Sequence, residues 1–191
     1  MAIITLPELA DLAVMAAAVG FIFSGIFRIN ASANYDPLKE HAGKKWVDWK
    51  NFRLAVMVAA PAVILHELAH KFVALGFGTQ AVFHAAYPWL GLGILLKLLN
   101  FGFIFFIPGY VSYFAGSLTH LQMALISVSG PLANLLLFIT AACLLKKAES
   151  RKWRTALYLT KQINLLLFIF NMLPIKPFDG GSFFSNILQA F

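Results

Sequence analysis

Residues 52–75 read FRLAVMVAAPAVILHELAHKFVAL, an apolar run of 24 residues whose second half contains the pattern His66-Glu67-x-x-His70. A helix rises about 1.5 Å per residue, so about 20 residues cross the roughly 30 Å hydrocarbon core of a bilayer. The run is therefore long enough to span a membrane. Ionisable side chains at that depth are costly and usually mark a functional site. We expect a membrane-spanning helix that carries chemistry on one face.

The composition of the whole chain favours a membrane protein. Of its 191 residues, 60% are hydrophobic and only 12% are charged, whereas soluble domains are about half apolar and about a quarter charged. The formal net charge is +7, but eleven of the 15 basic residues fall in two short segments, 28–53 and 146–154, that border apolar runs. Lysine and arginine collect in this way beside membrane spans. We expect the lipid bilayer as a partner and no nucleic acid.

The distribution of apolar runs predicts the architecture. Four stretches are suited to cross a membrane: 9–29, 52–75, 121–145 and 155–173. Between the second and third, residues 76–120 hold seven glycines and two prolines. Within them, residues 89–111 are apolar enough to cross the membrane, but they could equally form a re-entrant segment with short β-strands. We therefore expect an all-α polytopic membrane protein with about four transmembrane helices plus this Gly-rich re-entrant or short β segment. The whole chain, 1–191, would form a single membrane-embedded domain in the cell membrane, as a multi-pass protein.

The charge pattern constrains the topology. Segment 28–53 has six basic and three acidic residues, net +3, and segment 146–154 has five basic and one acidic, net +4. Loops rich in lysine and arginine tend to lie on one side of the membrane, the cytosolic side. The two segments share a side only if residues 76–120 turn back within the membrane. The charge pattern therefore favours the re-entrant interpretation.

The spacing of the two histidines indicates a metal site. His66 and His70 are four residues apart, so on a helix they project from one face about one turn apart. Two imidazoles placed in this way can bind one Zn²⁺, and the carboxylate of Glu67 lies where it can take a proton from water. The alternative is that both histidines are ordinary core residues and Glu67 is a structural ion-pair partner. The apolar surroundings favour the functional interpretation.

A catalytic zinc usually has three protein ligands, so a third is needed. Asp179 follows the last predicted span in a segment whose prolines and glycines allow the backbone to turn a carboxylate inward. Its alternative role is that of an ordinary turn residue before glycine. His84, His120 and Cys143 are weaker candidates. Asp179 reaches the same depth as the two histidines only in the re-entrant topology. The charge pattern and the choice of Asp179 as third ligand therefore require the same topology.

Three separated motifs resemble those of the site-2 protease family of intramembrane zinc metalloproteases. They are His66-Glu67-x-x-His70, Gly130-Pro131-x-x-Asn134 and Asn171-x-x-Pro174-x-x-Pro177-x-Asp179-Gly180-Gly181. The third is the most specific of them in a membrane chain. Together the motifs cover roughly residues 52–183. Phe178 stands where the family commonly has leucine.

The resemblance implies a role for each matched position. It implies a zinc site formed by three residues, His66, His70 and Asp179. It makes Glu67 the catalytic glutamate, gives Asn171 a role in holding the substrate or its oxyanion, and gives Asn134 a role in packing or substrate binding. It also implies that the Gly-rich segment contains strands on which an unfolded substrate adds as an edge strand. The family places the site nearer the cytosolic face, opposite to the orientation that the basic segments favour, so the orientation stays open.

The sequence therefore predicts a zinc metalloendopeptidase that cleaves peptide bonds within or near transmembrane helices of membrane protein substrates. The alternative is a metal-binding membrane transporter or an inactive protease-like scaffold, because transporters also place ionisable groups at mid-membrane. Glu67 distinguishes the two, since hydrolysis needs it and metal binding does not. A purely structural bundle would bind no metal. The sequence leaves the oligomeric state open.

Overall fold

Helices dominate the computed structural model, which describes residues 3–25, 48–101 and 107–191. In chain order the elements are α1 (Leu6–Phe23), α3 (Trp49–Gly76), β1 (Ala81–Ala85), α4 (Tyr87–Leu98), β2 (Gly109–Tyr113), the short 3-10 helix η1 (Ala115–Ser117), α5 (His120–Leu145), α6 (Arg151–Asn171) and α7 (Asp179–Ala190). Within the described ranges, α1, α3 and α5 are long and apolar enough to cross a membrane. The expectation of a mostly helical membrane protein is confirmed.

The predicted spans 52–75 and 121–145 lie within α3 and α5. Helix α1 covers much of the predicted span 9–29, whose last residues lie outside the described part of the chain. The fourth predicted span, 155–173, overlaps α6, which is not among the three apolar helices and whose first turn is basic. A fourth membrane crossing stays a prediction.

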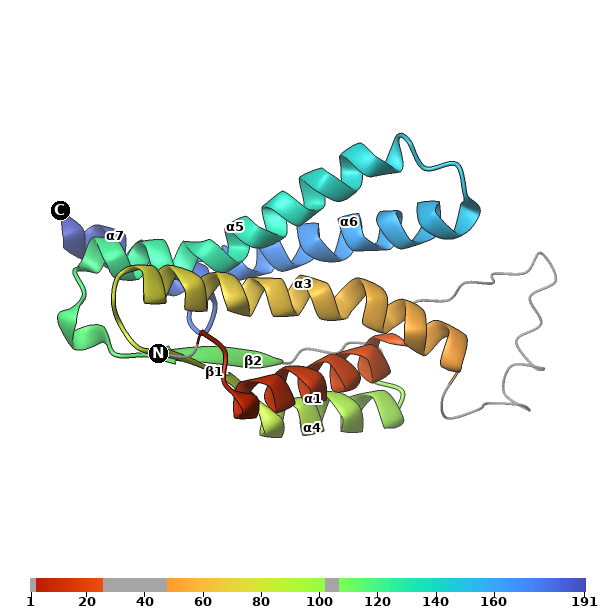
Figure 1. Cartoon of the computed structure of the whole chain (residues 1–191), viewed down its shortest axis with the longest axis horizontal. Helices are drawn as coiled ribbons and strands as arrows, with labels where there is room; N and C mark the ends of the chain where they lie inside the picture. The colour runs from red at the N-terminus through yellow and green to blue at the C-terminus, as the bar shows by residue number, and fades with distance from the viewer. Residues whose placement is uncertain (1–2, 26–47, 102–106) are drawn as a thin grey trace.

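The long helices run along the long axis of the molecule (Figure 1). Helix α5 packs against α3, α6 and α7, while α1 and the two strands pack against the other side of α3, and α4 packs against α1. The turn between α5 and α6 lies at the same end of the molecule as the start of α3 (right in Figure 1). The basic turn at 146–154 therefore shares an end with Lys50 and Arg53, as the re-entrant topology requires; the rest of the basic segment 28–53 lies outside the described residues.

Small side chains let α1 and α3 approach closely. On α3, Ala55 and Ala59 are fully buried, and on α1 so are Met15 and Val19. At Gly20 of α1, a Cβ atom would lie only 2.2 Å from a methyl carbon of Val56. Small residues at helix interfaces are typical of membrane proteins, where van der Waals packing holds helices together.

The segment between α3 and α5 contains an antiparallel strand pair. Ala81 of β1 lies opposite Tyr113 of β2, and the register continues to Ala85 opposite Gly109. The outer edge of β1 is closed by α1, because the backbone N–H groups of Phe83 and Ala85 donate to carboxylates on α1 at 2.8 and 3.1 Å. Residues 102–106 of this segment lie outside the described part. That the segment re-enters the membrane stays a prediction.

Candidate metal centre

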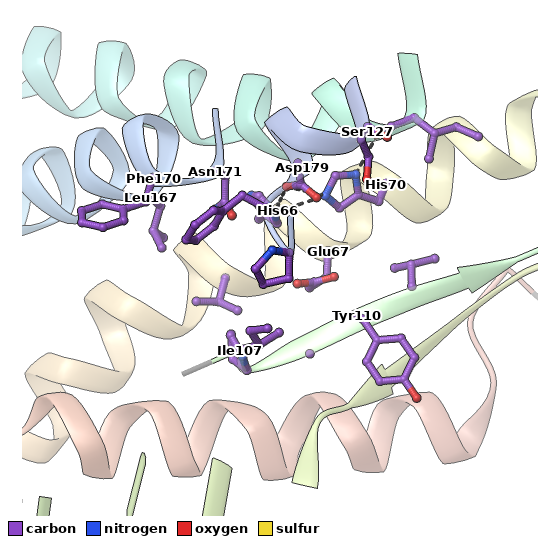
Figure 2. Close-up of a pocket in the computed structure, with 18 of the residues that line it drawn as sticks. His66, Glu67, His70, Ile107, Tyr110, Ser127, Leu167, Phe170, Asn171 and Asp179 are labelled. Carbon is purple, nitrogen blue, oxygen red and sulfur yellow. Dashed lines mark hydrogen bonds and ion pairs between the residues drawn. The ribbon is translucent and has the colours of Figure 1, made fainter. Parts of the chain in front are cut away.

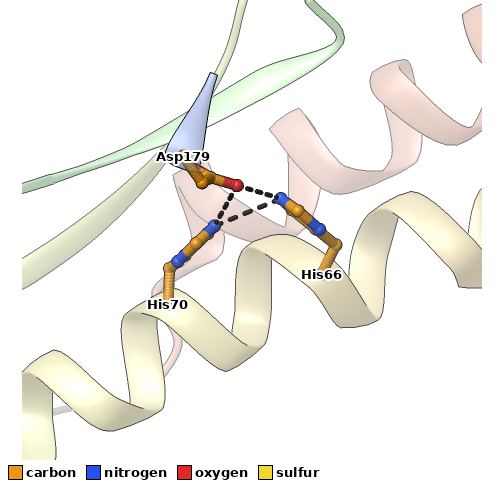
Figure 3. Close-up of side chains that lie close together, drawn as sticks. All are labelled: His66, His70 and Asp179. Atoms are coloured by element: carbon orange, nitrogen blue, oxygen red, sulfur yellow. Dashed lines mark hydrogen bonds and ion pairs between the residues drawn. The ribbon is translucent and has the colours of Figure 1, made fainter. Parts of the chain in front are cut away.

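Three side chains from two helices converge on one point (Figure 3). His66 and His70 project from one face of α3, and Asp179 is the first residue of α7. The Oδ2 atom of Asp179 lies 3.0 Å from Nε2 of His66 and 3.2 Å from Nε2 of His70, and the two Nε2 atoms are 3.1 Å apart. The structure thus brings together the three predicted ligand residues, although Asp179 lies 109 positions after His70 in the chain.

Local sequence explains how Asp179 reaches the histidines. Helix α6 ends at Asn171, and the prolines that follow cannot continue it because proline lacks an N–H group and clashes with the preceding turn. The chain then turns back and starts α7. At Gly180 a Cβ atom would lie 2.5 Å from the backbone of Met172, so only glycine allows the start of α7 to pack on the end of α6. The Asp-Gly-Gly sequence therefore serves close packing as well as turning.

The imidazole nitrogen that faces away from Asp179, Nδ1, forms a hydrogen bond to an oxygen acceptor in both histidines. Nδ1 of His66 lies 2.7 Å from Oδ1 of Asn134, and Nδ1 of His70 lies 2.7 Å from the backbone oxygen of Ile126. Each Nδ1 therefore carries a hydrogen and donates, which leaves the lone pair of each Nε2 directed at Asp179. Metal-binding histidines are usually held in this way, with the second ring nitrogen donating to an oxygen.

The donor set fits a zinc ion. Two imidazole nitrogens and one carboxylate oxygen are ligands of catalytic zinc sites, with bonds near 2.0–2.1 Å. In a tetrahedral site such bonds put neighbouring ligand atoms about 3.3 Å apart, close to the three separations of 3.0–3.2 Å found here. Next to these atoms, α5 has a glycine: a Cβ atom at Gly130 would lie 2.3 Å from Nε2 of His70 and 2.7 Å from Nε2 of His66. The helix leaves the space beside both nitrogens open.

The three side chains face a cavity of about 390 Å³ (Figure 2). Its walls come from the end of α1, α3, β2 and the residues just before it, α5, and α6 and α7 with the segment between them, and they are mostly apolar. Glu67 is 7% exposed and lines the cavity beside the histidines, and Asn171 lines it at the end of α6. Asn134 is fully buried and is not part of the cavity wall; it lies behind His66.

The other candidate ligands lie elsewhere. Nε2 of His84 is 3.0 Å from the hydroxyl of Ser112 on the strand pair. Nδ1 of His120 is 3.2 Å from the amide oxygen of Asn186. Cys143 is exposed near the end of α5. Within the part of the chain that is described, the group that can hold a metal ion is His66, His70 and Asp179.

Sequence reasoning missed Asn164, a buried polar residue behind the metal centre. Asn164 of α6 is fully buried, and its Oδ1 accepts a hydrogen bond of 2.9 Å from the amide nitrogen of Asn134. The signal was present in the sequence, because a polar amide stands in the apolar run 163–170 of a predicted span. Such residues in membrane helices usually face the protein interior.

Fold and site together define a class of protein: a membrane protein with a buried two-histidine, one-aspartate centre and a glutamate beside it. Comparison with known proteins gives the family. The family model described as "Peptidase family M50" matches residues 140–191. No solved structure matches the chain.

Three curated relatives carry the name "Putative zinc metalloprotease". MJ0611 of Methanocaldococcus jannaschii is 34% identical over 176 residues, which cover 91% of this chain and 81% of the relative. YwhC of Bacillus subtilis is 32% identical over 134 residues, covering 61% of this chain and 60% of the relative. Rip2 of Mycolicibacterium smegmatis is 29% identical over 133 residues, covering 62% and 51%.

The chain belongs to peptidase family M50, the site-2 protease family. It is a membrane metalloprotease, and its metal is zinc. The resemblance stated from the three motifs is confirmed at the level of the family, the enzyme class and the cofactor.

Proposed function

We propose that this protease hydrolyses peptide bonds within or near the transmembrane helices of membrane protein substrates, with zinc held by His66, His70 and Asp179. The observation that carries the proposal is the convergence of these three side chains, with atoms 3.0–3.2 Å apart, on an apolar cavity that also contains Glu67. The protein would act as a multi-pass protein of the cell membrane. Three apolar helices support a site within the bilayer region.

The chemistry assigned to Glu67 is proton transfer. When bound, zinc acts as a Lewis acid that polarises the scissile carbonyl and makes water more acidic. Glu67 accepts the proton that the attacking water loses, and then passes it to the leaving amine. Its position supports this role, since it lies next to His66 in the chain and faces the same cavity (Figure 2). The mostly apolar walls limit the number of competing waters.

Asn171 is assigned to the oxyanion. Its side chain lines the cavity at the end of α6, eight positions before Asp179 in the chain. An amide N–H placed near the scissile carbonyl stabilises the negative charge that develops on that oxygen. The proposal for Asn171 rests on this placement together with the family motif.

Strand β2 offers a place for the substrate backbone. Phe83 of β1 directs its N–H away from β2, so Val111, which lies opposite Phe83, directs its own N–H and C=O away from β1. Gly109 and Val111 of this strand also line the cavity. A substrate segment that has unwound from its helix can pair with this edge. Glycine, proline or asparagine in the substrate helix favours unwinding, because these residues are poor helix formers.

The test compares two variants in proteoliposomes. The purified chain is assayed for zinc content and for cleavage of a reporter protein with one transmembrane helix, made with and without a central Asn-Gly pair. We expect Glu67→Gln to bind zinc like the wild type and to lose at least about 10²-fold in kcat. The control, Glu149→Gln, removes an exposed carboxylate in the α5–α6 turn and leaves both readouts unchanged. Undiminished cleavage by Glu67→Gln would overturn the mechanism, and zinc binding without cleavage of any reporter would favour a transporter or scaffold.

A further inference from the structure

We propose that Asn164 is a positioning residue for the zinc ligand His66, acting through Asn134. The structure contains a continuous line of hydrogen bonds from α6 through α5 to α3 that ends on the His66 ring. The proposal rests on the zinc-binding role of His66 in the proposed function. In this proposal Asn134 holds His66 from behind the metal centre and does not contact the substrate.

The direction of each bond follows from two backbone carbonyls. The amide nitrogen of Asn164 lies 2.8 Å from the backbone oxygen of Thr160, and a carbonyl oxygen can only accept. Oδ1 of Asn164 is therefore turned toward Asn134, whose amide nitrogen lies 2.9 Å away. That nitrogen also lies 3.0 Å from the backbone oxygen of Ala62 on α3. Both hydrogens of the Asn134 amide group are thus used.

The orientation of Asn134 then fixes the tautomer of His66. Because the amide nitrogen of Asn134 faces two acceptors, its Oδ1 must face His66, where Nδ1 lies 2.7 Å away. An amide oxygen can only accept, so Nδ1 of His66 carries the hydrogen and Nε2 presents its lone pair to the metal position. Without the acceptor on Asn164, the Asn134 amide loses one of the two bonds that define its orientation.

Burial makes the arrangement stiff. Asn134 and Asn164 are each fully buried, so water cannot replace a lost partner without opening the packing between α5 and α6. In such surroundings a satisfied polar network holds its members in one geometry. His70 is held differently, by the backbone oxygen of Ile126 at 2.7 Å. A change at Asn164 should therefore act on His66 alone.

The competing explanation is that Asn164 only joins α6 to α5. A structural link of that kind would affect stability and leave the metal centre unchanged. The two explanations differ in zinc affinity, which does not depend on proteolysis. Loss of a residue that orients a metal-binding histidine typically costs 10–100-fold in metal affinity.

The experiment measures zinc affinity of the full chain in detergent by competition with a chelator. We expect Asn164→Leu to bind zinc roughly 10–100-fold more weakly than the wild type. Asn164→Asp, in which a protonated carboxyl donates to the carbonyl of Thr160 and still offers an oxygen acceptor to Asn134, should retain near wild-type affinity. The matched control is Asn186→Leu: Asn186 also donates to the carbonyl four residues before it, that of Ser182, at 2.8 Å, but has no contact in the line to His66. Its affinity should equal that of the wild type.

Each outcome bears on one proposal. If Asn164→Leu folds, by its thermal unfolding profile, and binds zinc as tightly as the wild type, the positioning role is overturned; equal losses in Asn164→Leu and Asn186→Leu would overturn it as well. If Asn164→Leu does not fold, Asn164→Ala removes the same acceptor without added bulk, and the same loss of affinity is expected. A wild-type chain that binds no zinc would instead contradict the proposed function.

Discussion

Lys71 of α3 and Glu8 of α1 form an ion pair in which each side chain exposes only 2% of its surface. Glu8 also accepts hydrogen bonds from the backbone N–H of Phe83 on β1 and from that of Thr5, each at 2.8 Å. One carboxylate therefore joins a strand to two helices, and its partner on α3 directly follows the proposed zinc ligand His70. The pair fixes α1 and β1 beside the metal centre.

We expect Lys71→Met to lower the free energy of unfolding by about 3–5 kcal/mol, because it leaves the buried carboxylate of Glu8 without a counter-ion. Replacing both partners, as Glu8→Gln with Lys71→Met, should restore much of this loss, since no charge is then left buried alone. Denaturant titration in detergent, followed by tryptophan fluorescence, measures both. The control, Lys50→Met at the exposed start of α3, should change the value by less than about 0.5 kcal/mol. An equal loss in the single and double variants would show that the charge is not the cause.

Asp179→Ala should abolish tight zinc binding while the chain stays folded. The change removes a ligand itself, so the loss of affinity should exceed the roughly 10–100-fold that follows from losing a contact behind a ligand. Chelator competition measures it. The matched control is Asp48→Ala, which removes a carboxylate that caps the start of α3 on the protein surface. That variant should keep wild-type affinity, and unchanged affinity in Asp179→Ala would mean that another residue is the third ligand.

Gly130→Ala tests the space beside the two histidines. The added methyl group would lie 2.3 Å from Nε2 of His70, nearer than any ordinary contact, so the rings must move apart. We expect zinc content to fall to a small fraction of the wild-type value, although alanine favours the helix. The matched control is Gly91→Ala on α4, where the new methyl group has no neighbour within 4 Å apart from the adjoining backbone of its own helix. Full zinc content in Gly130→Ala would place the metal elsewhere.

The predictable parts of the site were those set by local sequence. His66 and His70 lie on one helical face, so their spacing alone brings them together. Asp179 could be chosen from its prolines and glycines because these end α6 and permit close packing. The depth of Asp179 stays a prediction that rests on placing both basic segments on one side of the membrane; the start of α3 and the α5–α6 turn lie at one end of the molecule (Figure 1).

The parts that sequence reasoning missed depend on contacts between distant elements. Glu8 and Lys71 are 63 residues apart, and nothing in either segment alone identifies the other. The direction of the Asn134 side chain depends on how α5 is rotated against α3, which a single sequence does not specify. Similarly, the apolar pattern places Asn164 within a predicted span, and only its burial beside Asn134 identifies its partner. Short strands are predicted for residues 76–120, but their pairing across α4 and their register are contacts between distant positions that a single sequence does not specify.

Asn171→Ala should lower kcat by about 10²–10³-fold, the usual effect of removing one donor to an oxyanion. Zinc affinity should stay at the wild-type value, because Asn171 lines the cavity and is not one of the three ligand residues. Cleavage of the reporter helix and chelator competition give the two readouts. The control is Asn186→Ala on α7, outside the cavity wall. A fall in zinc affinity that matches the fall in kcat would indicate that Asn171 shapes the metal centre.

Val111→Pro tests the edge of β2 as the place where the substrate backbone binds. Proline removes the N–H group that Val111 directs away from β1, and it leaves the bonds between the two strands in place because Val111 and Phe83 are not a hydrogen-bonded pair. We expect kcat/KM for the reporter helix to fall by roughly 2–10-fold, the equivalent of one hydrogen bond, with zinc affinity unchanged. Val111→Ala shortens the same side chain but keeps the N–H group, so it separates the backbone effect from the side-chain effect. If Val111→Ala loses as much activity as Val111→Pro, the substrate contacts the side chain and does not pair with the strand.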